Sequence, residues 1–141
     1  MGQSGTKLFA ALAVIALSLF SARQHAAAQT KTSDEFAAVL GEWRGESICL
    51  ARKPICKDEK VIYRIRRSAE DPSRISVIAD KIVDEHPVYM GTLACDYEKI
   101  KQVLSCEMPQ GVWKFTVAGM KMQGTLTLND KTLARRVSVE K

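Results

Sequence analysis

The stretch MKMQGTLTL at positions 120–128 alternates apolar Met120, Met122, Leu126 and Leu128 with polar Lys121, Gln123, Thr125 and Thr127. Successive side chains of a β-strand point to opposite faces, so this alternation predicts a strand with one apolar face and one polar face. The same period recurs at Val61, Tyr63 and Ile65 and again at Leu133, Val137 and Val139. These stretches predict an all-β protein whose sheet buries one face.

Turn residues divide the chain after position 41 into eight candidate strands, at 42–51, 58–67, 73–84, 87–97, 101–108, 112–118, 120–128 and 132–140. All four prolines lie between these strands or at the first residue of one, where no ladder hydrogen bond is lost. Short connections make consecutive strands antiparallel neighbours, and closing the sheet removes its unpaired edges. We therefore expect an eight-stranded antiparallel up-and-down barrel, with a β-sandwich as the alternative.

The N-terminus has the order of a secretory signal peptide. Lys7 precedes an apolar or small run at 8–20, polar residues follow at 23–25, and Ala26, Ala27 and Ala28 supply a cleavage site. As a helix, the thirteen residues of this run cover about 20 Å, against about 30 Å for a bilayer core, so we expect cleavage and no membrane span afterwards. The prediction is a cleaved signal peptide at 1–28, a single domain at 29–141, and a periplasmic or secreted protein.

A short helix is expected between residues 33 and 40. Ser33 is a good N-cap, Asp34 and Glu35 suit a first turn, and Gly41 is a stop. Residues 29–32 before it are expected to form a loose arm.

Four cysteines, Cys49, Cys56, Cys95 and Cys106, allow three disulfide pairings. Cys49 and Cys56 lie symmetrically about a predicted reversal, and so do Cys95 and Cys106, so hairpin geometry favours these two local pairs. There is no Cys-x-x-Cys spacing, and His86 is the only histidine after position 28. The sequence therefore predicts structural disulfides, with no metal site and no cofactor.

The sequence Gly41-Glu42-Trp43 at the start of the first strand resembles the Gly-x-Trp opening of lipocalin and fatty-acid-binding barrels, together the calycins, and avidin-like barrels open similarly. This resemblance implies that Trp43 packs at the closed end of the barrel, beneath an arginine from near the C-terminus. Arg135 or Arg136 would take that place through a cation-π contact. The resemblance implies no particular ligand.

An eight-stranded barrel is either filled by its own side chains or holds one small ligand. The first hypothesis is a non-catalytic binding protein for a small apolar or amphipathic molecule, with an aromatic pocket drawn from Tyr63, Tyr89, Tyr97, Trp113 and Phe115. The alternative is a protein-interaction or inhibitor module with a filled barrel, which contacts a protein partner through the arm or through the loop between Cys49 and Cys56.

Other function classes fit less well. Removing residues 1–28 leaves 19 basic and 16 acidic residues, a weak excess that argues against a nucleic-acid binder. Asp84, Glu85 and His86 form a polar cluster that we interpret as a solvated turn, so we expect no enzyme. The strands are short and carry few aromatics, which argues against an outer-membrane barrel. The oligomeric state stays open.

Overall fold

A computed structural model describes residue 2, residues 34–51 and residues 55–141. The chain divides into two units, Met1–Lys31 and Thr32–Lys141, and all the strands belong to the second. Apart from residue 2, the predicted signal peptide lies outside the described residues, as do the arm at 29–32, the N-cap Ser33 and positions 52–54 in the first loop. Within the described residues, no helix is long and apolar enough to cross a membrane.

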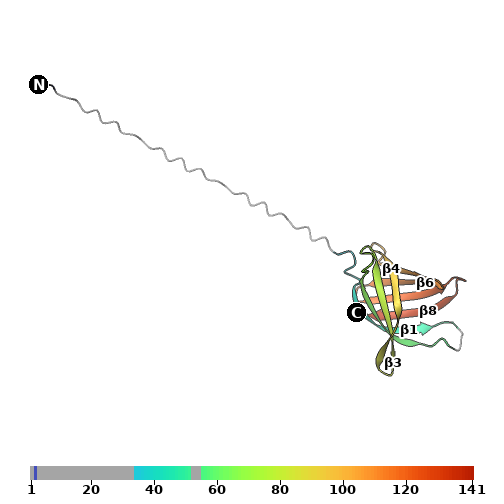
Figure 1. Ribbon diagram of the computed structural model, residues 1–141. Helices are drawn as coiled ribbons and strands as arrows, with labels where there is room; N and C mark the ends of the chain where they lie inside the picture. Colours follow the sequence, from blue (N-terminus) through green and yellow to red (C-terminus); the bar gives the residue numbers. More distant parts are fainter. Residues whose placement is uncertain (1, 3–33, 52–54) are drawn as a thin grey trace. The chain divides into compact units, whose positions relative to one another are not determined.

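Eight antiparallel strands close into a barrel in sequence order, and the last pairs with the first (Figure 1). They are β1 (Gly41–Cys49), β2 (Glu59–Arg67), β3 (Ile75–Val83), β4 (His86–Glu98), β5 (Val103–Met108), β6 (Gly111–Ala118), β7 (Lys121–Leu128) and β8 (Leu133–Glu140). The predicted up-and-down barrel is confirmed, and the sandwich alternative is wrong. Each strand differs from its predicted bounds by only a few residues.

The alternating apolar side chains form one core inside the barrel. It contains Trp43 from β1, Val61, Tyr63 and Ile65 from β2, Ile75 and Val77 from β3, Leu104 from β5, Phe115 and Val117 from β6, Met122 from β7, and Val137 and Val139 from β8. In β1 the inward face is the one that carries Trp43 and Ser47, which are both buried. The barrel has two ends: we call the end at Gly41 the plugged end and the end at Cys49 the open end.

The predicted N-terminal helix is wrong. Residues 35–39 form turns. The carbonyl of Phe36 accepts hydrogen bonds from the amides of both Val39 and Leu40, so the segment makes one helix-like contact without continuing as a helix. The Asp34 side chain accepts a hydrogen bond from the amide of Phe36, which gives this backbone an alternative to a helix. So short a segment cannot overcome the cost of helix nucleation, and packing of its apolar side chains sets its shape.

This turn segment fills the plugged end. Phe36 and Val39 are buried beside Trp43, whose indole Nε1 donates to the carbonyl oxygen of Val39 at 2.8 Å. The cation over the Trp43 ring is Lys141, with Nζ 5.3 Å from the ring centroid. Arg67 lies over the ring of Phe36 in the same way, 4.8 Å from its centroid.

The expected arginine over Trp43 is therefore absent. Arg135 pairs with Cys49, six residues along β1 from Trp43, a separation of about 20 Å along the strand. Arg136 pairs with Ile48 and is exposed on the outer face. Lys141, at the end of the chain, occupies the place that the resemblance gave to an arginine.

Both predicted disulfides are present, Cys49 with Cys56 and Cys95 with Cys106, with Cα separations of 5.9 and 4.2 Å. The second lies where β4 and β5 part. These strands share three ladder pairs, between residues 96–98 and 103–105, and among the described residues the part of β4 from His86 to Cys95 has ladder partners on β3 alone.

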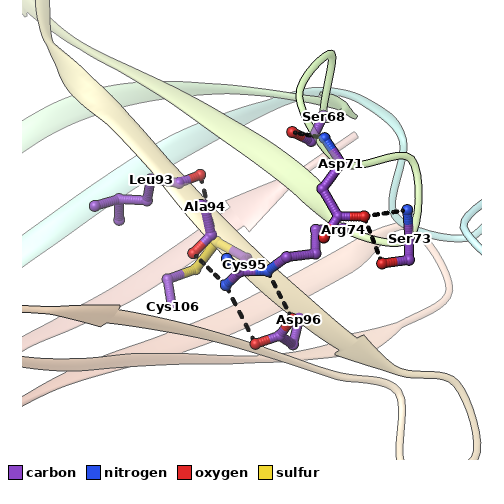
Figure 2. Close-up of polar contacts among 9 residues, drawn as sticks. All are labelled: Ser68, Asp71, Ser73, Arg74, Leu93, Ala94, Cys95, Asp96 and Cys106. Atoms are coloured by element: carbon purple, nitrogen blue, oxygen red, sulfur yellow. Dashed lines mark hydrogen bonds and ion pairs between the residues drawn. A yellow bond between two sulfur atoms is a disulfide. The ribbon is translucent and has the colours of Figure 1, made fainter.

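Figure 2 shows how β4 is held beside this point. Arg74 Nε donates to Asp96 Oδ1 at 2.8 Å, and its Nη2 donates to Oδ2 at 3.2 Å and to the Ala94 carbonyl at 3.4 Å. The loop before Arg74 is ordered by Asp71, whose carboxylate accepts hydrogen bonds from the amide and hydroxyl of Ser73. The plugged end of β4 is thus well braced, whereas its other half forms a long hairpin with β3.

Candidate ligand-binding cavity

A cavity of about 270 Å³ lies inside the barrel towards the open end. Residues from all eight strands line it, so the closed sheet itself shapes the walls. The core residues at the plugged end, including Trp43, form no part of its lining. The cavity therefore ends above a filled core.

One wall of the cavity is apolar and comes from β3 to β7. It contains Val77, Leu93, Met90, Met108, Trp113, Phe115 and Leu126. The rings of Trp113 and Phe115 are stacked, 5.4 Å between centroids and 8° apart, and Tyr63 meets Phe115 edge to face at 5.7 Å. Gly124 makes room for Phe115, because a Cβ there would lie 2.3 Å from the Phe115 ring.

The opposite wall is polar and comes from β1, β2 and β8. Arg135 Nη1 donates to Ser47 Oγ at 3.0 Å and lies 3.3 Å from Glu59 Oε2, while Nη2 donates to the carbonyl of Lys57 at 3.1 Å. Lys81 Nζ lies 3.8 Å from the other oxygen of Glu59. Two cations thus share one carboxylate, and this cluster carries a net charge of about +1 at neutral pH.

Tyr63 joins the two walls. Burial raises the pKa of its phenol well above the ordinary value, and the charge of Glu59 acts in the same direction. The positive charge of Arg135 and a side-chain hydrogen bond with Ser47 lower the pKa, but burial outweighs them. Tyr63 therefore stays protonated at neutral pH and can donate or accept a hydrogen bond.

Three of the five aromatics expected at a pocket, Tyr63, Trp113 and Phe115, line this cavity. Tyr97 lies instead at the plugged end, where its ring centroid is 6.2 Å from that of Phe36. Tyr89 is 64% exposed, and its hydroxyl lies 3.0 Å from Thr92 Oγ1.

A β-bulge explains the position of Tyr89. Ala79 pairs with Gly91 and Asp80 with Tyr89, so Met90 is an extra residue in β4 and the alternation reverses there. Strict alternation from buried Cys95 would point Tyr89 inwards. Sequence reasoning also missed the polar wall, since it placed Arg135 or Arg136 over Trp43 and gave Ser47 and Glu59 no role.

The polar cluster at 84–86 lies at the tip of the β3–β4 hairpin. Asp84 and Glu85 both have positive φ, 49° and 67°, as a two-residue hairpin turn of type I′ requires. His86 pairs with Val83 and is exposed. In the part of the chain that the structure describes, no three His, Cys, Asp or Glu side chains are grouped to hold a metal ion.

No protein-family model, no curated protein and no solved structure matches this chain. The closed, eight-stranded antiparallel barrel is compatible with a calycin-like fold. The case for a function therefore depends on the cavity itself.

Proposed function

We propose that the protein is an exported, non-catalytic binding protein that holds a small apolar or amphipathic ligand in its barrel. The observation that carries this proposal is the cavity with one apolar wall and one polar wall. Ligand sites of this kind combine apolar and aromatic lining with a few polar groups that fix orientation. A closed barrel also supplies a preformed site, which reduces the entropy cost of binding.

The proposed export rests on the signal-peptide order of residues 1–28 and on the disulfides. Disulfides persist in the periplasm and outside the cell and are rare in reducing compartments. The proposed location is therefore periplasmic or extracellular.

Native mass spectrometry of the mature, oxidised protein from its own host tests the binding proposal. We expect a stoichiometric small molecule that denaturation releases. Ala79 lines the cavity, so Ala79→Leu should displace the molecule, whereas Ala94→Leu adds the same atoms at an exposed position and should retain it. A ligand-free mass for the wild type and both variants, with circular dichroism showing that each protein is folded, would contradict the proposal.

One observation favours a second candidate, a protein-interaction module. Ile55 is 90% exposed within the loop that the Cys49–Cys56 disulfide closes. A constrained loop with an exposed apolar side chain suits contact with a protein partner. This candidate predicts a ligand-free mass and a partner from the same envelope fraction whose binding is lost in Ile55→Ser.

A further inference from the structure

We propose, building on the binding function above, that the ligand is a small aromatic acid, with its flat ring against Trp113 and its carboxylate at Arg135. The inference concerns the chemical class of the ligand, and three features of the cavity carry it.

The first feature is the aromatic surface. Trp113 and Phe115 lie parallel on β6 and both line the cavity, and Trp113 is only half-buried. A flat ring against the indole would continue this parallel arrangement and bury apolar surface on both partners. Met90 and Met108 line the same space, and thioether sulfurs make favourable contacts with aromatic rings.

The second feature is the charge of the polar wall, whose Arg135 lies at the same level as Trp113 and two strands along, since Leu126 pairs with both. Arg135 is anchored by Ser47, Glu59 and the Lys57 carbonyl, so these contacts fix the orientation of its guanidinium. Lys81 adds a second cation beside the same carboxylate. A planar carboxylate fits the fork of a guanidinium, and the excess positive charge favours an anion over a neutral or cationic ligand.

The third feature is size. A cavity of about 270 Å³ is near the lower end of ligand pockets, which range from about 300 to 1,000 Å³. A one- or two-ring acid fits this volume, whereas a long acyl chain would extend beyond it. The ring and the carboxylate of such an acid would thus contact different parts of the lining, Trp113 of β6 and Arg135 of β8.

Titration of the mature, oxidised protein with four probes tests the inference: benzoate, indole-3-acetate, neutral indole and octanoate. We expect at least one of the two aromatic acids to bind at least ten-fold more tightly than both indole and octanoate. Arg135→Gln should weaken the binding of that acid at least ten-fold and change the affinity for indole less than two-fold. Trp113→Leu should weaken the binding of both the acid and indole.

Removing Arg135 leaves Glu59 without its closest cation, so Glu59→Gln/Arg135→Gln provides a second variant that should show the same selective loss without an unpaired carboxylate. Octanoate binding as tightly as the aromatic acids, or a released ligand without an aromatic acid, would overturn this inference and leave the binding function standing. If no probe binds and the protein purifies ligand-free, both proposals fail.

Discussion

Cys95 of β4 faces Cys106 of β5 one residue beyond the last ladder pair between these strands, Asp96 with Ser105. The disulfide thus lies at the point where the ladder between β4 and β5 ends and β4 continues in its long hairpin with β3. Beside it, Arg74 holds Asp96 through two hydrogen bonds (Figure 2). The contact between residues 96–98 of β4 and 103–105 of β5, which we call the seam, has the fewest ladder pairs in the barrel. The Cys95–Cys106 disulfide extends the seam by one covalent link.

Removing the seam disulfide should destabilise the protein more than removing the other one. The sequence separations are 11 for Cys95–Cys106 and 7 for Cys49–Cys56, for which the chain-entropy model gives about 3 and about 2.5 kcal/mol. Cys95 and Cys106 are also fully buried. Urea unfolding of the two double Cys→Ala variants measures this difference, and amide exchange should accelerate in β4 in the seam variant alone. Equal losses with unchanged exchange in β4 would contradict the role of the seam.

Trp43→Phe should lower the free energy of unfolding by about 2–4 kcal/mol. It removes part of a fully buried side chain and leaves the Val39 carbonyl without the indole donor. Lys141→Gln removes only the cation over the ring and should cost less than about 1 kcal/mol. Urea unfolding of both variants separates the two contributions. A loss in Lys141→Gln equal to that in Trp43→Phe would mean that the cation, not the hydrogen bond and packing, fixes the plugged end.

Local patterns predicted the strands and the disulfides because both depend on short sequence separations. Alternation identifies a strand within a few residues, and a hairpin determines which cysteines lie opposite each other. Barrel closure was expected because eight sequential strands with short loops would otherwise leave two edges. The structure agrees on each of these points.

The site was less predictable because it depends on long-range register. Alternation with Val137 and Val139 suggests that Arg135 points inwards, but the pairing of β8 with β1 decides which end of the barrel it occupies. The extra residue Met90 reverses the alternation of β4, and the adjacent Gly91 was the only local hint of irregular backbone. Tyr89 was misplaced for that reason.

Gly124→Ala should destabilise the protein by about 1–3 kcal/mol, because its Cβ would lie 2.3 Å from the buried ring of Phe115. Phe115→Leu in the same chain should recover part of this loss by removing the obstructing ring atoms. Thr125→Ala, on the polar face of the same strand, is the control and should stay within about 0.5 kcal/mol of wild type. Thermal unfolding measures five proteins: wild type, Gly124→Ala, Phe115→Leu, the double variant and Thr125→Ala. Additive losses in the double variant would argue against the contact.

Tyr63 should make the protein sensitive to alkali. Burial raises the pKa of its phenol above the unfolded value of 10.0, so above about pH 10 the unfolded chain releases a proton that the folded protein retains. The unfolded state then gains free energy, and stability falls by up to about 1.4 kcal/mol per pH unit from this group. Below pH 10 the phenol is protonated in both states and contributes no pH dependence.

Tyr63→Phe should therefore make the free energy of unfolding decline less steeply between pH 10 and 11.5. The lost hydroxyl can also change the free energy of unfolding at pH 8, but that change does not affect the slope. Burial also raises the pKa of Tyr97, so Tyr97→Phe should change the slope in the same direction. Urea midpoints measured at several pH values for the three proteins provide the comparison, since lysines and other groups contribute alike to all of them. Parallel curves for wild type and Tyr63→Phe would mean that the Tyr63 phenol is not desolvated in the folded protein and that its pKa is not raised.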